Sequence, residues 1–215
     1  MNKRIQLRMS SAPRSGSTFI CQIIGMLQNN SECRSHGYDK SRNIIVFRDF
    51  LDSAISYYRV MNDLSDNFFI EDKSVLDKII SDYIPYTNNI IKYLNDGINR
   101  LYLVYEYDIK SDEGNYYDKI FSKLSEFCGI KIGDELKNKI INETNIETNK
   151  LRSNKYETFH KWDSKNLIHG KHVHTGKVGI WKTHVHKTLH SYYESSLLSN
   201  NYEYCINKLG YEKKN

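Results

Sequence analysis

Short apolar runs alternate with longer stretches of helical periodicity along the chain. Residues 43–47 and 101–105 are apolar runs of strand length, residues 4–9 alternate between polar and apolar residues like a short strand, and a further short strand is predicted around 32–36. The run at 43–47 (Asn-Ile-Ile-Val-Phe) is typical of a strand buried on both faces of a parallel sheet. We therefore predict a sheet that is mostly parallel.

The stretches between these runs repeat their apolar residues at helical spacing. The predicted helices cover residues 18–28, 52–61, 74–95, 116–128, 185–199 and 202–209. Asp52 is expected to cap the second of them, Pro85 to break the third, and Gly129 to end the fourth. Residues 152–180, rich in Lys, His and Gly, are predicted to form a long loop, and long loops in compact domains are usually functional.

Strands that alternate with helices predict an α/β fold with a central sheet flanked by helices. No internal repeat and no linker rich in Pro, Gly or Ser divides the sequence, so residues 1–215 are expected to form a single domain. The four cysteines are scattered without a CxxC pair and are interpreted as reduced thiols: Cys21, Cys33, Cys128 and Cys205.

The net charge and the hydropathy of the sequence limit the kinds of binding partner that can be expected. The net charge of +5 suits an anionic ligand, but the basic residues are dispersed and predict no nucleic-acid partner. The sequence has no signal peptide and no membrane-spanning apolar stretch, so a cytoplasmic protein without a membrane partner is expected. The histidines gathered after residue 159 follow no familiar ligand pattern, and no metal site is predicted. A homo-oligomer is compatible with the sequence.

A small-residue segment, Ser11-Ala-Pro-Arg-Ser-Gly-Ser-Thr18, joins the first predicted strand to the first predicted helix. A glycine turn that enters a helix aims several backbone N–H groups at one point, and the helix dipole adds positive potential there. The hydroxyl groups of Ser15, Ser17 and Thr18 and the guanidinium of Arg14 add further donors. The segment is a predicted anion site, although a strand–helix turn without a ligand can have the same composition.

This segment differs from the loop that binds ATP and GTP, in which the glycine is followed by Lys and then Ser or Thr. Here Gly16 is followed by Ser17, and the cation precedes the glycine at Arg14. A nucleotide-dependent kinase is nevertheless an alternative, because Asp49 follows an apolar strand as the acidic residue that organises magnesium does.

A second anion site is predicted from the spacing of Arg48 and Ser56. Arg48 ends the strand at 43–47, and Ser56 lies in the early turns of the helix that follows. The two side chains can therefore converge on one anion at the ligand-binding edge of the sheet. The alternative is a surface salt bridge from Arg48 to Asp49 or Asp52.

Pro13-Arg-Ser-Gly-Ser-Thr-Phe19 resembles the 5′-phosphosulfate loop of the sulfotransferase family, and residues 44–59 resemble that family's 3′-phosphate segment. The resemblance implies a P-loop-containing, three-layer α/β fold. It also implies an enzyme that uses 3′-phosphoadenosine 5′-phosphosulfate (PAPS), releases 3′-phosphoadenosine 5′-phosphate (PAP) and requires no metal. The residues implied to bind the phosphates are Arg14, Ser15, Gly16, Ser17, Thr18, Arg48 and Ser56.

Two aromatic residues and a glycine loop extend the resemblance. Tyr105 matches a tyrosine that helps to hold adenine in the family, and Phe19 takes the place of a second aromatic contact to adenine. Either ring could instead fill the core. Gly176 and Lys177 open a segment similar to the glycine loop that closes over the 3′-phosphate, although the Arg-Lys pair that usually precedes this glycine is missing. The contacts that hold the 3′-phosphate are therefore expected to differ from those usual in the family.

Arg34-Ser-His36 resembles the strand end whose histidine is the family's catalytic base. In the implied reaction His36 takes the proton of an acceptor hydroxyl, and Arg14 stabilises charge on the departing 5′-phosphate oxygen. The stretch between these two residues is shorter than usual, so part of the acceptor pocket is missing. The alternative bases are His172, His174 and Glu106. The acceptor is expected to be a small molecule or glycan with a hydroxyl group, and a non-catalytic PAP-binding module is a further alternative.

Overall fold

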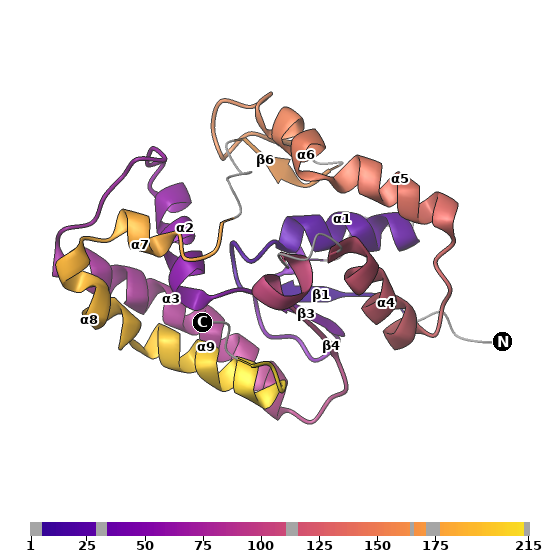
Figure 1. The fold of residues 1–215 in the computed structure, drawn as a ribbon, viewed down its shortest axis with the longest axis horizontal. Helices are drawn as coiled ribbons and strands as arrows, with labels where there is room; N and C mark the ends of the chain where they lie inside the picture. The colour runs from indigo at the N-terminus through magenta and orange to yellow at the C-terminus, as the bar shows by residue number, and fades with distance from the viewer. Residues whose placement is uncertain (1–5, 29–33, 111–115, 164–165, 171–176, 213–215) are drawn as a thin grey trace.

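A computed structural model describes residues 6–28, 34–110, 116–163, 166–170 and 177–212 (Figure 1). Its centre is a four-stranded sheet in the order β2-β1-β3-β4, in which every neighbouring pair is parallel. The strands are β1 (Met9–Ser11), β2 (Arg34–Ser35), β3 (Ile44–Phe47) and β4 (Leu101–Val104). The predicted parallel sheet is confirmed, although its first strand begins later than expected.

The helices flank this sheet on both sides (Figure 1). The longer ones are α1 (Ser17–Gln28), α2 (Phe50–Met61), α3 (Lys73–Asn95), α4 (Tyr116–Cys128), α5 (Asp134–Thr144) and α9 (Leu197–Lys208). The shorter ones are α6 (Ile146–Ser153), α7 (Trp181–His184) and α8 (His190–Glu194). A π-helical turn, η1 (Tyr105–Ile109), follows β4 directly, and a 3-10 turn, η2 (Lys187–Leu189), precedes α8.

Alternate side chains of β3 enter two separate cores. Ile44 and Val46 pack with α1, α4 and α5, while Ile45 and Phe47 pack with α2, α3 and α9. All four side chains are fully buried, as expected for a strand with helices on both faces. The arrangement confirms the predicted three layers, with the sheet in the middle (Figure 1).

The helix α2 begins earlier than the sequence predicts. Asp49, rather than Asp52, caps it, because Asp49 Oδ1 accepts hydrogen bonds from the backbone N–H groups of Leu51 (2.8 Å) and Asp52 (3.1 Å). Asp52 lies inside the first turn and is completely buried. Its carboxylate oxygens therefore accept hydrogen bonds from residues outside α2.

The helix α3 continues through Pro85, so the predicted break is wrong. Pro85 and Ser81, whose carbonyl loses its partner in that turn, are both exposed, and water can satisfy the lost hydrogen bond. On the opposite face Tyr83 and Ile90 are buried. Their packing holds the helix together on both sides of the proline.

The predicted loop at 152–180 contains an antiparallel hairpin of β5 (Trp162–Asp163) and β6 (Ile168–His169). Gly170 follows it at a close approach, since a Cβ there would lie 2.4 Å from the carbonyl oxygen of Thr158. The helices predicted at 185–199 and 202–209 have the wrong bounds, because the chain turns at Ser195 and Ser196 between α8 and α9.

The cysteines differ in state. Cys21, in α1, is disulfide-bonded, which corrects the expectation of a reduced thiol at that position. Cys128 and Cys205 are free thiols. Burial raises the pKa of the Cys205 thiol to about 12, so this group is unreactive at neutral pH.

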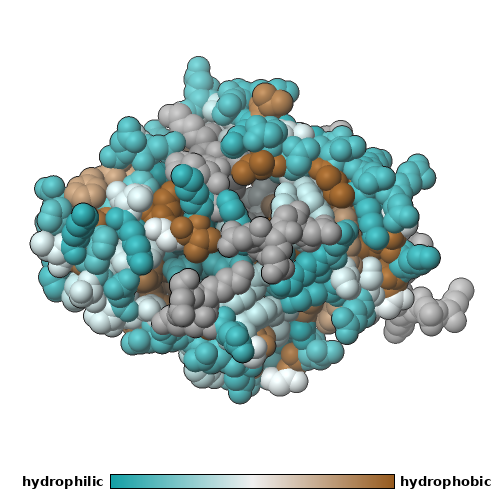
Figure 2. All heavy atoms as spheres, viewed as in Figure 1, coloured by the Kyte–Doolittle hydropathy of each residue, from teal (hydrophilic) through white to brown (hydrophobic). Residues whose placement is uncertain are grey.

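The face of the molecule in Figure 2 is mostly hydrophilic, with hydrophobic residues in small separate groups. The exposed apolar side chains include Leu151 on α6 and Met61 at the end of α2. Over the described parts of the chain, no helix combines the length and the apolar character needed to cross a membrane.

Candidate active site

The predicted phosphate loop lies between the end of β1 and the start of α1. Gly16 adopts a φ of +77°, and a Cβ at this position would lie 2.9 Å from Cδ2 of the Tyr105 ring. Glycine is therefore required both by the backbone conformation and by the close approach of Tyr105. Arg14 also has a positive φ of 64°, a conformation that is uncommon outside glycine and is often found at functional sites.

Internal hydrogen bonds hold this loop. The buried Ser15 hydroxyl lies 2.6 Å from the carbonyl oxygen of Ala12, to which it donates. Tyr83, fully buried on α3, donates its hydroxyl proton to the carbonyl oxygen of Pro13 (2.6 Å). The Ser15 hydroxyl thus stabilises the loop itself, and a direct contact from Ser15 to the cofactor stays a prediction.

Ser17 and Thr18 begin α1 and are both buried. They lie where the backbone N–H groups of the first turn and the helix dipole favour an anion. Phe19 follows them but is directed toward α4, where its ring meets Tyr116 (5.9 Å) and Tyr117 (5.5 Å) edge-on. These contacts agree with the alternative that Phe19 packs in the core, and its contact with adenine stays a prediction.

The two predicted anion sites meet through one side-chain contact. Arg14 Nε donates a hydrogen bond of 3.0 Å to Ser56 Oγ on α2. Ser56 is half-buried and lies two turns after the N-cap Asp49. The loop before α1 and the start of α2 therefore contribute neighbouring polar groups to one region of the molecule.

Arg48 is buried at the end of β3, so the salt bridge to Asp52 considered from the sequence does form, but in the interior and not at the surface. Its Nη2 lies 2.9 Å from Asp52 Oδ2 and also donates to the carbonyl oxygen of Lys177. Its Nε lies 3.5 Å from Glu106 Oε1. The Tyr105 ring, 4.8 Å from the guanidinium carbon, covers the group from one side.

Glu106 is a buried neighbour of Arg48 that the sequence suggested only as an alternative base. Its pKa is raised to about 7, mainly by burial and also by the nearby Asp49 carboxylate, while Arg48 acts in the opposite direction. Its carboxylate accepts hydrogen bonds from the Tyr202 hydroxyl (2.9 Å) and from the backbone N–H of Asp49 (3.2 Å). These contacts favour a role in shaping the surroundings of Arg48.

His36 lies beside the end of β1, where its Nδ1 is 2.9 Å from the carbonyl oxygen of Ser11. A carbonyl oxygen only accepts, so Nδ1 carries a proton, and in the neutral imidazole the lone pair is then on Nε2. Asn89 of α3 donates to the backbone carbonyl of His36 (3.3 Å) and supports this strand end. The tautomer is the one that a general base requires.

The glycine loop near residue 177 approaches Arg48 from the C-terminal part of the chain. Gly176 lies outside the described residues, as do His172 and His174. Lys177 is exposed, and its carbonyl oxygen contacts Arg48. Asp52 accepts hydrogen bonds from the backbone N–H groups of Gly179 and Trp181 in this loop. The sequence pattern predicts Asp52 only as a helix cap and contains no signal for this role.

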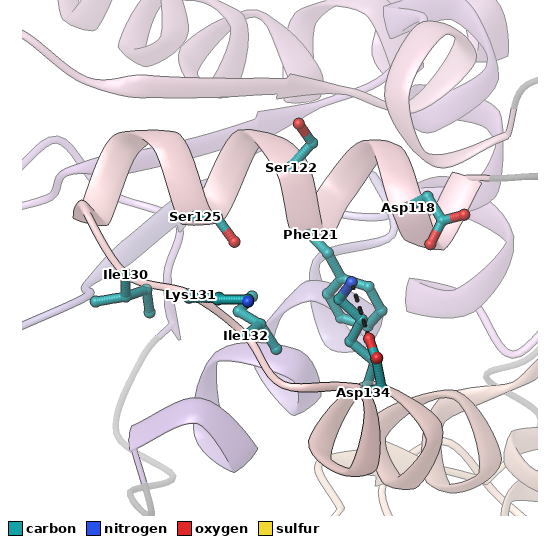
Figure 3. Close-up of a pocket in the computed structure, with 9 residues that line it drawn as sticks. Asp118, Phe121, Ser122, Ser125, Ile130, Lys131, Ile132 and Asp134 are labelled. Atoms are coloured by element: carbon teal, nitrogen blue, oxygen red, sulfur yellow. Dashed lines mark ion pairs between the residues drawn. The ribbon is translucent and has the colours of Figure 1, made fainter.

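A pocket of about 530 Å³ lies between α4 and the start of α5 (Figure 3). Lys137 and Asp134 form an ion pair of 3.5 Å at its wall. Its lining residues are Asp118, Phe121, Ser122, Ser125, Ile130, Lys131, Ile132, Asp134 and Lys137. It shares no residue with the predicted cofactor site. Among the described residues, no group of three or more His, Cys, Asp or Glu side chains is arranged to hold a metal ion.

Comparison with known proteins agrees with this geometry. Residues 34–197 match the family of sulfotransferase domains, a range that includes His36, Arg48, Ser56 and Tyr105 but not the loop before α1. No curated protein sequence matches the chain. The fold is similar to that of mouse sulfotransferase SULT7A1 complexed with PAP, with a TM-score of 0.59 and 15% identity, covering 96% of this chain and 84% of that one. Because the family match extends over most of its length, the chain belongs to the sulfotransferase family.

Proposed function

We propose that the protein transfers the sulfuryl group of PAPS to an acceptor hydroxyl and releases PAP. Family membership supports the reaction. The observation that supports its location is the 3.0 Å hydrogen bond from Arg14 to Ser56, which joins the predicted 5′-phosphosulfate loop to the predicted 3′-phosphate segment. A nucleotide that carries phosphate at both positions requires two such neighbouring anion sites.

The proposed reaction is an in-line displacement at sulfur. The bond from sulfur to the bridging oxygen of the 5′-phosphate breaks while a bond from sulfur to the acceptor oxygen forms, and the acceptor proton passes to His36. Negative charge grows on the departing oxygen, where Arg14 and the N-terminus of α1 stabilise it. Ser17 and Thr18 supply hydroxyl donors in the same turn.

His36 is the proposed base because the bond from its Nδ1 to Ser11 leaves the lone pair on Nε2. A base placed within hydrogen-bond reach of the proton typically contributes about 10²–10⁴-fold to the rate. His36 is only partly buried, which allows an acceptor to approach the ring. The acceptor is proposed to be a small molecule or glycan that presents a hydroxyl.

Arg48, Ser56 and Lys177 are proposed to bind the 3′-phosphate, and Tyr105 to hold the adenine. Tyr105 contacts both anion sites, since its ring lies beside Gly16 and over the Arg48 guanidinium. Among the hydrogen bonds of the described residues, the Arg48 guanidinium makes none through Nη1. This edge of the guanidinium can donate to a phosphate oxygen.

The kinase alternative is weakened by the role of Asp49. Its carboxylate caps α2 through two backbone N–H groups, and burial raises its pKa to about 6. A group used in this way has less capacity to hold magnesium. A non-catalytic PAP-binding module would need the anion sites but not the His36 tautomer.

The test is incubation with PAPS and a panel of alcohols, phenols, amines and glycans, with products identified by mass. We expect a hydroxyl acceptor to gain one sulfuryl group and PAP to be released in equal amount. Binding of PAP without a product from any acceptor would favour the non-catalytic module. Phosphoryl transfer from ATP with magnesium would overturn the proposal.

A further inference from the structure

Asp52 accepts hydrogen bonds from three separate donors around Arg48. It is completely buried in the first turn of α2. Its Oδ2 lies 2.9 Å from Arg48 Nη2 and 2.8 Å from the backbone nitrogen of Gly179, and its Oδ1 lies 2.9 Å from the backbone nitrogen of Trp181. Both carboxylate oxygens therefore accept hydrogen bonds. Arg48 is a charged donor, and the two backbone N–H groups direct the positive ends of their dipoles toward the carboxylate.

These donors come from distant parts of the chain. Arg48 precedes Asp52 by one helical turn, whereas Gly179 and Trp181 follow it by 127 and 129 residues. Arg48 itself contacts the same loop through the carbonyl oxygen of Lys177. The loop at 177–181 is thus tied to the pair of Arg48 and Asp52 by three hydrogen bonds.

The contacts require a carboxylate in particular. An asparagine has one accepting oxygen and one NH₂ group, which only donates. In either orientation of the amide, its NH₂ group would face at least one of the donors of Arg48, Gly179 and Trp181. A buried donor left without its acceptor destabilises the bound arrangement of the loop.

We propose that Asp52 is a positioning residue that couples closure of the loop at 177–181 to the binding of the 3′-phosphate by Arg48. The inference rests on the proposed function, in which Arg48 and Lys177 hold that phosphate. Asp52 and Lys177 occupy Nη2 of Arg48 and orient Nη1 for the ligand. A bound 3′-phosphate then meets a guanidinium and a loop that are fixed by the same carboxylate.

Two kinetic consequences follow. If the loop at 177–181 covers the bound 3′-phosphate, as proposed, PAP leaves when that loop moves away from Asp52, so the carboxylate slows dissociation more than it affects association. The preference of the protein for nucleotides that carry a 3′-phosphate also depends on the Asp52 carboxylate. Loop opening and product release limit the turnover of many enzymes, so a looser loop should raise KM for PAPS and, where PAP release limits turnover, raise kcat as well.

The test compares Asp52→Asn with the control Asp49→Asn, which changes the neighbouring carboxylate but does not contact the loop. Binding of PAP and of adenosine 5′-monophosphate is measured by stopped flow and titration calorimetry. We expect Asp52→Asn to weaken the binding of PAP by about 10–100-fold through faster dissociation, since hydrogen bonds to charged groups are lost. The affinity for adenosine 5′-monophosphate should change by less than about threefold. Asp49→Asn should leave the affinities for both ligands nearly unaffected.

A second variant tests the loop from its other side. Gly179 has a φ of +73° with open space where a Cβ would be added, so Gly179→Ala strains the loop without a clash. Gly210→Ala, with a φ of +74° and equally open surroundings, is its control. We expect Gly179→Ala to speed PAP dissociation and Gly210→Ala to have no effect on it, and this comparison remains decisive if Asp52→Asn fails to fold.

Equal losses of both nucleotides in Asp52→Asn, or an unchanged PAP dissociation rate in Gly179→Ala, would overturn the coupling. These outcomes are separate from the proposed function, because they are read from binding alone. A protein that binds PAP but transfers no sulfuryl group would refute the function and leave the coupling intact.

Discussion

Two buried carboxyl groups flank Arg48, and their surroundings differ. Asp52 accepts hydrogen bonds from Arg48 and from two backbone N–H groups of a distant loop. Glu106 lies farther from the guanidinium, at 3.5 Å from Nε, and burial raises its pKa to about 7. A phosphate bound at Arg48 would therefore lie near Glu106, a carboxyl group that can take up a proton near neutral pH.

We expect Glu106→Gln to change the pH dependence of stability. Because the folded pKa of Glu106 is raised from 4.5 to about 7, its contribution to stability is complete below pH 4.5 and is lost as the pH rises through 7. The full difference corresponds to about 3 kcal/mol. Urea titrations from about pH 5 to pH 8 should show the parent losing stability relative to Glu106→Gln.

The PAP affinity of the same pair of proteins gives an independent check. A nearby 3′-phosphate favours the protonated form of Glu106, so the parent should bind PAP less tightly as the pH rises through 7. The phosphates of PAP titrate equally for both proteins, and only the difference between the proteins reports on Glu106. Parallel affinity profiles would contradict this account.

His36→Ala should lower turnover by at least about 10²-fold and leave the affinity for PAP nearly intact, because a base acts in the transition state. The rate of the parent should also fall at low pH as an imidazole becomes protonated. His186→Ala, which changes a partly exposed histidine at the start of η2, is the matched control. Turnover within a few-fold of the parent in His36→Ala would make the assignment wrong and direct attention to Glu106.

At the scale of elements, α3 connects the two halves of the reaction site. Tyr83 donates to the carbonyl oxygen of Pro13 in the phosphate loop, and Asn89 donates to that of His36. Tyr93, one turn later, donates to the carbonyl oxygen of Gly37. The helix therefore fixes the distance between the phosphate loop and the proposed base, and its burial explains why it stays continuous through Pro85.

Gly16→Ala tests the contact between the phosphate loop and η1. The added Cβ would lie 2.9 Å from the Tyr105 ring at a φ of +77°, so we expect a loss of roughly 1–3 kcal/mol in stability and a weaker affinity for PAP. Gly97→Ala has a similar φ of +73° with open space around the Cβ, and it should lose stability without losing PAP affinity. Equal PAP affinities in the two variants, measured by calorimetry, would contradict the assignment of this loop.

Periodicity was sufficient to predict the elements that carry the site but not the contacts within it. The strand at 44–47 and the helix after it could be placed because their apolar pattern is strong and local. The hydrogen bonds from Gly179 and Trp181 to Asp52 could not, because they span 127 and 129 residues and depend on the tertiary fold. For the same reason the sequence predicts Asp52 only as a helix cap.

At the scale of the whole molecule, the candidate site draws on segments spread over most of the chain. The loop before α1, the ends of β2, β3 and β4, the start of α2 and the loop at 177–181 all contribute to it. The parallel sheet brings the carboxyl ends of its strands to one edge, where ligands of open α/β sheets bind. The resemblance in the sequence predicted these segments because each is a short motif, and the family match confirms the family.

A ligand that contacts all of these segments should stabilise the entire fold. At 100 times its dissociation constant, PAP is expected to add about 2.7 kcal/mol to the free energy of unfolding, and thus about 5–10 °C to the Tm of a protein of this size. Magnesium should not be needed, because Arg14 and Arg48 supply the positive charge near the two phosphates. Thermal melts with PAP, with PAP and EDTA, and with ATP and magnesium check this. A shift with ATP and magnesium alone would contradict the sulfotransferase assignment of the site, because the two anion sites would then not be matched to a 3′,5′-bisphosphate.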